Sequence, residues 1–397
     1  MVNMPISGAV QSARVPWWWF AVVAACSLAS TMVVDMVGSA AVRQIQVRRT
    51  ARRLLEAEVE QEPYRGTSWG RPYWDAIELY KESWQPYYVY RVGSMTTPFI
   101  NVSDGVRATH RTAARAGVPN RLVFLFGGSA AWGHGARDEA TIPSWLARVG
   151  EEQGEPLDVR NYAESGWVNW QGITYLTQKL ADGERPDTVI FYSGVNEILS
   201  GRQWPQVRHP VWDGEAVPRA MTDWALERSR PLARVWDHYR NTSYLWSLLV
   251  PRAPVLAASR PIGRSELAKQ LAADYLAARE LVEQMGRAFG FKTLFAWQLT
   301  VADKPALTAQ ERHYAGWLPR TPATTPAIAW WSMDAELKEL YGEAGRLVKE
   351  GGTIDVTDAL VHTTDTAFID WMHTSEAGNE RVARALYDRL RTPTHAH

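Results

Sequence analysis

The chain has 397 residues, and 46% of them are hydrophobic, so it is long and apolar enough to bury a sizeable core. Lysine plus arginine equal aspartate plus glutamate at 43 each. This balance gives no indication of a nucleic-acid partner or of another strongly charged one. The only cysteine is Cys26, which excludes disulfides, a thiolate nucleophile and a cysteine-based metal site from the rest of the chain.

The first apolar segment runs from Val15 to Val34 without a charged residue. Its length approaches the roughly 20 residues that a helix needs to cross a bilayer. Trp17–Trp19 near its start resemble an interfacial aromatic belt. The alternatives are a cleaved signal peptide and a lipoprotein box in which Cys26 would be acylated. Because the apolar run continues past Cys26, we expect an uncleaved transmembrane anchor.

The charges around the anchor bear on its orientation. Arg14 precedes the segment, whereas five arginines follow it: Arg43, Arg48, Arg49, Arg52 and Arg53. Taken alone, the positive-inside rule places the following body in the cytoplasm.

The next two segments connect the anchor to the body. Residues 43–62 have a basic first half and an acidic second half, and Pro63 follows them, which predicts a helical stalk. Residues 64–117 are rich in aromatics, glycine and proline and lack a sustained period. We expect an irregular segment that packs on the main domain.

The main domain shows alternating strand and helix patterns. Short apolar runs predict strands at 121–126, 157–163, 188–193, 292–298 and, more weakly, 353–357. Helical patterns lie between or after them, at 142–152, 170–181, 264–289, 332–350 and 375–391. This alternation predicts an α/β fold with a parallel sheet and helices on both faces.

Residues 200–261 break the alternation and are too long for an ordinary connection, so they are predicted to be an insertion or lid. The segment contains five tryptophans: Trp204, Trp212, Trp224, Trp236 and Trp246. They could stack on sugar rings, but we expect them to fill a small core of the insertion itself. The predicted parts are therefore a tail (1–14), an anchor (15–42), a stalk with the irregular segment (43–117) and a catalytic domain (118–397) that contains this insertion.

Ser129 follows the first predicted strand in the sequence FLFGGSAAWGHG. Small neighbours allow a tight strand-to-helix turn that exposes the hydroxyl, as a nucleophile requires. The alternatives are a glycine-rich turn with an incidental serine and a phosphate-binding loop. The segment has neither the Gly-Lys-Ser/Thr ending of the Walker pattern nor a G-x-G-x-x-G, which argues against the phosphate loop.

A serine hydroxyl needs a base, and the base needs an orienting carboxylate. Asp370 and His373 provide both in Asp370-Trp371-Met372-His373, just before a helix that Thr374 or Ser375 could cap. The carboxylate could accept one ring N–H and leave the other nitrogen facing Ser129. His134 is the competing histidine, but it has no neighbouring carboxylate beyond Asp138 and is interpreted as a loop residue.

Two further residues could stabilise an oxyanion. Gly166 follows the second strand in NYAESGW and could bring its backbone N–H close to a substrate. Asn196 follows the third strand in FYSGVNE and could donate from its side-chain amide. Both are also ordinary turn residues. The joint pattern favours a catalytic site over ordinary turns, because all these residues lie at the carboxyl edge of the predicted sheet, where open parallel sheets place their sites.

These segments resemble the four blocks of the SGNH (GDSL-like) hydrolases, in the family's order: Gly127-Gly128-Ser129, Gly166, Gly194-Val195-Asn196-Glu197 and Asp370-Trp371-Met372-His373. The resemblance covers Arg121 to about Arg391 and implies a three-layer α/β/α, flavodoxin-like fold. The segments PFINVSDGVR and RDEATIPSWL also resemble membrane-anchored members from bacterial polysaccharide gene neighbourhoods. Two residues depart from the family pattern: Gly128 replaces an aspartate, and Glu197 stands where aspartate is common.

The resemblance implies roles for each residue. Ser129 attacks an ester carbonyl, His373 transfers the proton, and Asp370 holds the imidazole. The backbone N–H groups of Ser129 and Gly166, with the Asn196 amide, form the oxyanion hole. No metal or organic cofactor is implied. An α/β-hydrolase fits less well, because its nucleophile follows a mid-sheet strand and its acid lies far from the histidine.

We therefore expect a serine esterase acting on O-acyl, mainly O-acetyl, groups of a cell-envelope or extracellular polysaccharide. A polysaccharide O-acyltransferase with the same triad and an inactive, membrane-anchored glycan-binding scaffold are the alternatives. The resemblance implies a single-pass protein of the bacterial inner membrane with an extracytoplasmic (periplasmic) catalytic domain. The arginines after the anchor argue for the opposite orientation.

Overall fold

The computed structural model describes residues 16–77, 79–113, 120–205, 207–210, 235–236, 239–240, 243–250, 262–315 and 334–391. The chain divides into two compact units. The helical unit comprises Met1–Arg53 and Thr222–Val255, and the body comprises Leu54–Met221 and Leu256–His397. The predicted tail 1–14 lies outside the described residues.

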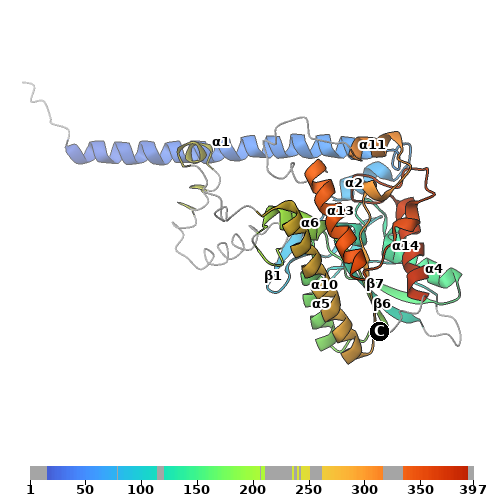
Figure 1. The fold of residues 1–397 in the computed structure, drawn as a ribbon. Helices are drawn as coiled ribbons and strands as arrows, with labels where there is room; N and C mark the ends of the chain where they lie inside the picture. Colours follow the sequence, from blue (N-terminus) through green and yellow to red (C-terminus); the bar gives the residue numbers. More distant parts are fainter. Residues whose placement is uncertain are drawn as a thin grey trace, which may run out of the picture. The chain divides into compact units, whose positions relative to one another are not determined.

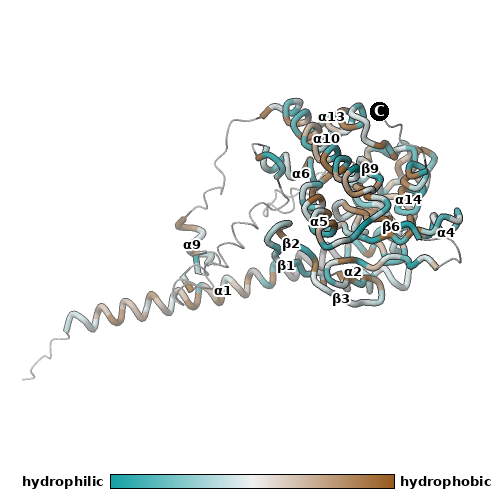
Figure 2. The backbone as a smooth tube through the Cα atoms, turned by 90° about the horizontal axis from the view of Figure 1, so that it is seen from below, coloured by the Kyte–Doolittle hydropathy of each residue, from teal (hydrophilic) through white to brown (hydrophobic). Residues whose placement is uncertain are grey.

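One long helix, α1 (Trp17–Val59), replaces the anchor and the stalk that the sequence predicted as separate segments. No proline or glycine pair interrupts the sequence between them, so the helix runs through to Val59. Its stretch Trp17–Gln46 is long and apolar enough to cross a membrane, although a signal sequence would have the same properties. Figure 2 shows the hydrophobic character along this part of α1 and along α9 (Tyr244–Leu249), a short helix of the same unit.

The body is built on a seven-stranded sheet with the order β3-β4-β5-β7-β6-β8-β9. Four strands are parallel: β6 (Arg121–Gly127), β7 (Leu157–Asn161), β8 (Thr188–Ser193) and β9 (Lys292–Trp297). Ile354 adds a parallel bridge to Ala296 beside β9. When the parallel strands are numbered in chain order, with the bridge at Ile354 as the fifth, their order in the sheet is 2-1-3-4-5. This is the flavodoxin-like arrangement, so the predicted α/β fold with a parallel core is confirmed.

Helices cover both faces of this sheet (Figure 1). On one side lie α4 (Ile142–Glu152) and α14 (Glu376–Arg391); on the other lie α5 (Asn169–Ala181), α10 (Arg264–Phe289) and α13 (Ala335–Glu350). Thr141 caps α4 by accepting from Ser144 N, and Asp334 caps α13 by accepting from Leu337 N. The predicted helices thus lie close to where their periodicity placed them.

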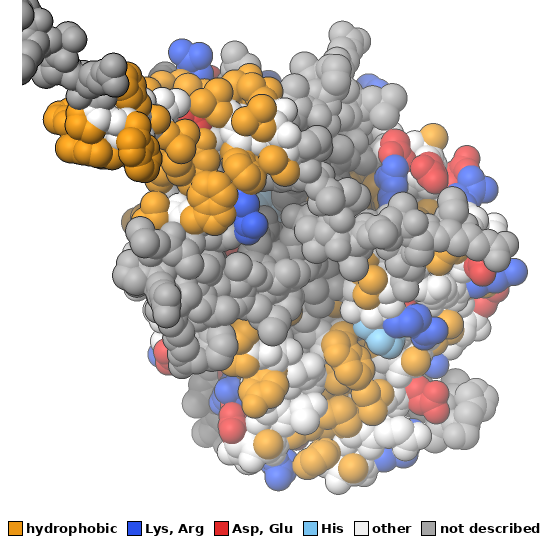
Figure 3. All heavy atoms as spheres, turned by 90° about the vertical axis from the view of Figure 1, so that its left-hand side faces the viewer, with side chains coloured by type: hydrophobic (Ala, Val, Ile, Leu, Met, Phe, Trp, Pro, Cys, Tyr) orange, Lys and Arg blue, Asp and Glu red, His pale blue; other side chains and the backbone are white. Residues whose placement is uncertain are grey.

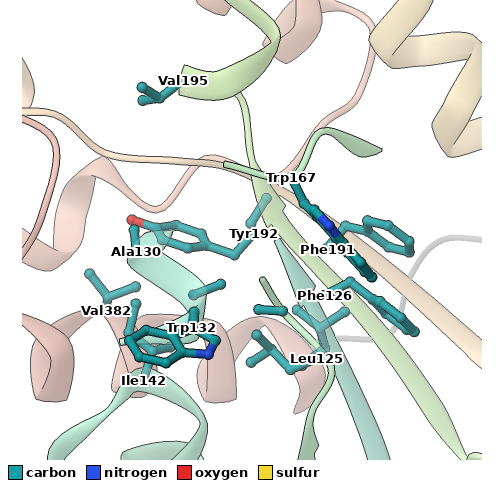
Figure 4. Packing of buried hydrophobic residues seen from close by; sticks show 14 of the residues in the cluster. Leu125, Phe126, Ala130, Trp132, Ile142, Trp167, Phe191, Tyr192, Val195 and Val382 are labelled. Atoms are coloured by element: carbon teal, nitrogen blue, oxygen red, sulfur yellow. The ribbon is translucent and has the colours of Figure 1, made fainter. Parts of the chain in front are cut away.

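The alternation of side chains along β6 supplies both layers of the core. Leu125 lies on the side of Ile142 and Val382, whereas Phe126 stacks on Phe191 with ring centroids 5.0 Å apart (Figure 4). Successive strand residues point to opposite faces, and here both faces are covered. The core therefore runs continuously on both sides of the strand that ends at the candidate nucleophile.

The segment 64–117 is not irregular, which corrects the sequence prediction. It contains α2 (Gly70–Ile77), a hairpin of β1 (Glu82–Gln85) and β2 (Val89–Val92), and the antiparallel strands β3 (Met95–Thr96), β4 (Asn101–Ser103) and β5 (Val106–Arg107). β5 pairs with β7 and so makes the sheet mixed instead of purely parallel. Strands of two or three residues are too short to show a period in sequence.

Two other boundaries differ from expectation. The weak strand predicted at 353–357 is reduced to the bridge at Ile354 and a 3-10 turn, η3 (Thr357–Leu360). The start of the predicted insertion lies inside α6 (Val195–Gln203). Trp212 and Trp224 lie outside the described residues. Trp236 and Trp246 pack against each other with centroids 5.2 Å apart, and Tyr239 joins them.

Candidate active site

Ser129 lies at the sharp turn between β6 and α3 (Ser129–Trp132). A Cβ on Gly128 would lie 2.2 Å from Asn196 Nδ2, so this position has no room for a side chain unless Asn196 moves. Ser129 remains partly exposed, while Ala130, Ala131 and Trp132 after it are buried. The turn therefore presents the hydroxyl at the carboxyl edge of the sheet, as the sequence predicts.

Gly128→Ala should test this close approach. We expect the added methyl group to displace the Asn196 amide. On the oxyanion role that the family resemblance implies for this amide, kcat for ester hydrolysis should fall by roughly 10²-fold, the loss typical of one misplaced donor. KM should change much less. The measurement is steady-state kinetics on a p-nitrophenyl ester. Gly342→Ala is a control at a helical glycine of α13 with open space around it, and equal losses for both variants would contradict the account.

The three predicted residues Ser129, His373 and Asp370 lie in one hydrogen-bonded series. Ser129 Oγ is 2.6 Å from His373 Nε2, and His373 Nδ1 is 2.5 Å from Asp370 Oδ2. The other carboxylate oxygen, Oδ1, accepts the backbone N–H groups of Met372 and His373, both at 2.7 Å. Because both oxygens are engaged, the carboxylate is fixed and in turn fixes the imidazole, whose residue is 1% exposed.

The electrostatics of the series favour an ionised Asp370. Burial alone would raise the pKa of this carboxyl. The charge and hydrogen bond of His373, together with the two backbone N–H groups, outweigh burial and hold the pKa below its usual range. The carboxylate can therefore stabilise a positive imidazole at neutral pH.

His134 does not occupy the position of the base. Its ring is packed 4.7 Å from the ring of His373 and 5.3 Å from that of Trp74, centroid to centroid. Burial, and then the charge of His373, lower the pKa of His134 to about 3. A neutral ring at this place packs against the imidazole without adding a second positive charge.

The loop that carries Gly166 is held by residues that the sequence did not single out. Gly166 has a φ of +73°, a left-handed conformation that favours glycine. Two residues earlier, the buried Glu164 carboxylate accepts hydrogen bonds from Tyr80 Oη at 2.6 Å, Val92 N at 2.8 Å and Ser165 N at 3.0 Å. The early segment thus positions the Gly166 loop, and no local pattern in the sequence marks this long-range contact.

Asn196 lies in the first turn of α6, which follows β8. Its Nδ2 donates to Trp167 O at 2.9 Å, which leaves the second amide hydrogen for another acceptor. β6 and β8 are the neighbouring strands at which the chain reverses its order across the sheet, the place where open α/β sheets bind ligands. Ser129 and Asn196 therefore flank the switch point of the fold.

The end of α1 lies near the acidic member of the series. Glu58 contacts the Gln61 side chain. Burial, followed by the negative charge of Asp370, raises the pKa of Glu58 to about 8. A carboxyl near Asp370 is thus kept largely neutral at pH 7, which limits repulsion between the two. In the sequence, Glu58 belongs only to the acidic half of the predicted stalk.

Glu197, which stands where the resembled family commonly has aspartate, is half-buried. Its Oε1 accepts the backbone N–H of Asn169 at 2.7 Å and so fixes the start of α5. Burial raises the pKa of Glu197 to about 7, against the lowering effect of that hydrogen bond.

Glu197→Gln should reveal this shift as a pH-dependent stability. In the unfolded chain the carboxyl ionises near its usual 4.5, whereas in the folded chain it ionises near 7. Ionisation therefore disfavours the folded state increasingly from pH 4.5 to about 7, and then no further. The measurement is the free energy of unfolding in denaturant, for the variant relative to wild type. This difference should favour the variant by up to about 3 kcal/mol more at pH 8 than at pH 5. A difference independent of pH would contradict the shift.

Within the described residues there is no group of three or more histidine, cysteine, aspartate or glutamate side chains that could hold a metal ion.

No family model and no curated protein matches the sequence. The structure is similar to several solved ones, each over most of the other chain. A lipase/acylhydrolase from Enterococcus faecalis is 16% identical, with 70% of this chain and 100% of that chain covered and a TM-score of 0.33. The acetylxylan esterase Axe2 from Geobacillus stearothermophilus is 11% identical, with 69% of this chain and 96% of that chain covered and a TM-score of 0.34.

A member of the lipolytic G-D-S-L family from Veillonella parvula is 13% identical, with coverages of 70% and 100% and a TM-score of 0.33. The strand order of the sheet is itself that of a flavodoxin-like α/β fold.

Proposed function

We propose that this protein is a serine esterase that removes O-acyl, mainly O-acetyl, groups from a cell-envelope or extracellular polysaccharide. The proposal is carried by the hydrogen-bonded series Ser129–His373–Asp370, with distances of 2.6 and 2.5 Å, at the switch point of the sheet.

In the first half of the reaction Ser129 Oγ attacks the ester carbonyl carbon. His373 Nε2 takes the hydroxyl proton as the new C–O bond forms, and Asp370 stabilises the imidazolium through Nδ1. The tetrahedral intermediate then collapses, and the bond to the sugar oxygen breaks. His373 returns its proton to that oxygen, so a sugar hydroxyl leaves and the acyl group remains on Ser129.

In the second half water attacks the acyl-serine. His373 takes one proton from the water and returns it to Ser129 Oγ as the carboxylic acid leaves, which restores the starting state. In both steps the backbone N–H groups of Ser129 and Gly166 and the Asn196 amide stabilise the negative charge on the carbonyl oxygen by donating hydrogen bonds to it. Each such donor contributes about 3 to 4 kcal/mol to transition-state stabilisation.

The cellular setting follows from α1. Trp17–Gln46 provides a single transmembrane anchor, and a polysaccharide outside the cytoplasm requires an extracytoplasmic body. We therefore place the body on the periplasmic side of the inner membrane, against the tendency of the arginines that follow the apolar run. The side chains of Arg43, Arg48, Arg52 and Arg53 lie outside the described residues.

Incubation of the full chain, in detergent, with an O-acetylated polysaccharide tests the reaction. We expect free acetate to appear in equal amount to the sugar hydroxyls released, measured by proton NMR. With an unacetylated glycan added, new acetyl esters on that glycan would instead identify the O-acyltransferase. Neither product from folded protein, on this or a small acetyl ester, would contradict the proposal and favour the glycan-binding scaffold.

A further inference from the structure

The helical unit contains an acidic residue in an unusual place. Asp35 is the only acidic residue in the apolar stretch Trp17–Gln46, and no charged residue lies between Trp17 and Asp35. At 1.5 Å per helical residue, Trp17 to Asp35 spans roughly 27 Å, which is close to the ~30 Å hydrocarbon thickness of a bilayer. With Trp17–Trp19 at one interface, Asp35 reaches the other.

Around Asp35, hydrogen bonds connect α1 to the start of α9. The Asp35 carboxylate accepts from the Ser243 hydroxyl, from Ser39 Oγ at 3.1 Å and from Leu245 N at 3.4 Å. Tyr244 N donates to Ser39 Oγ at 2.9 Å. These contacts satisfy a carboxylate that would be costly beside lipid, and they attach α9 at that position along α1.

Most side chains of α9 are apolar and exposed. Its sequence YLWSLL has one polar residue, and Leu248 and Leu249 are 64% and 78% exposed. Hydrophobic side chains gather on the surface of the helical unit (Figure 3, upper left). The aromatic cluster Trp236, Tyr239 and Trp246 adjoins them, and tryptophan and tyrosine are the residues enriched at membrane interfaces.

From these contacts we propose that α9 is a second membrane contact, lying in the lipid interface beside α1 and held there by Asp35 and Ser39. The apolar surface of α9 then faces the acyl-chain boundary of the bilayer, because Asp35 and Ser39 attach this helix to α1 at the level where the apolar stretch reaches the interface. The inference rests on the proposed anchoring of α1 in a membrane. It gives the predicted insertion a lipid-binding part.

The test is depth-dependent fluorescence quenching with the full chain in phosphatidylcholine vesicles. In a Cys26→Ala background, which has no other cysteine, a fluorophore is attached at Leu248→Cys, at Val23→Cys in α1, or at Thr177→Cys on the exposed surface of α5. Lipids carrying a nitroxide high on the acyl chain should quench the label at residue 248. A deep nitroxide should quench the label at residue 23, and neither should quench the label at residue 177.

The outcomes separate the two proposals. Quenching at residue 23 with none at residue 248 would overturn the inference and leave the anchor intact. No quenching at either position would overturn the membrane anchor of the proposed function, and the inference with it. Asp35→Ala should lower quenching at residue 248 while residue 23 stays quenched; unchanged quenching at residue 248 would overturn the attachment through Asp35.

Discussion

Ser129→Ala should lower kcat for p-nitrophenyl acetate by roughly 10⁶-fold, and His373→Ala should do the same. The two groups act as a unit, so removing either leaves only binding and oxyanion stabilisation. Asp370→Asn should cost about 10⁴-fold, because an amide cannot hold the imidazole in the required tautomer. The double variant should be no slower than either single one.

The matched control is Ser200→Ala. Ser200 Oγ is buried and makes no hydrogen bond to the described residues, so removing it should leave kcat near the wild-type value. Far-ultraviolet circular dichroism and thermal unfolding should be unchanged in Ser129→Ala. Activity that persists in this variant would contradict the site assignment.

Lys304→Met should lower the free energy of unfolding by about 3 to 5 kcal/mol, the cost of leaving a buried charge unpaired. The Lys304 and Glu311 side chains form an ion pair with both side chains 0% exposed. Lys304 Nζ also donates to Asp365 O at 2.6 Å, and Glu311 Oε1 accepts from Ala367 N at 2.8 Å. The pair therefore holds the loop that leads into Asp370, and urea unfolding measures its effect.

Lys349→Met provides the control for this variant. Lys349 pairs with Asp355 at 3.1 Å, but the two side chains are 27% and 48% exposed. A solvated pair of this kind contributes about 1 kcal/mol or less. Similar losses in the two variants would show that burial does not determine the cost of removing Lys304.

The parallel core of the fold could be predicted from sequence because its signals are local. The runs of β6, β8 and β9 are continuous and apolar, as strands covered on both faces require. The series Ser129–His373–Asp370 could also be anticipated, because the edge of a parallel sheet brings together residues that follow its strands. The structure places these three side chains within hydrogen-bonding distance.

Long-range polar contacts could not be predicted in this way. Tyr80 and Glu164 are 84 positions apart, and neither lies in a motif that indicates its partner. The same holds for Arg107, which is 1% exposed and binds Asp138 at 2.9 Å and Gly133 O at 2.7 Å, beside the nucleophile turn. A buried cation of this kind is visible only once its partners are in place.

The most direct test of the central claim is covalent labelling of the full chain with a fluorophosphonate, followed by mass spectrometry of its peptides. We expect one phosphonylated residue, Ser129, because its hydroxyl is hydrogen-bonded to His373, which can take its proton. Labelling should disappear in His373→Ala. A label on another serine, or labelling of Ser129 that persists without His373, would contradict the account.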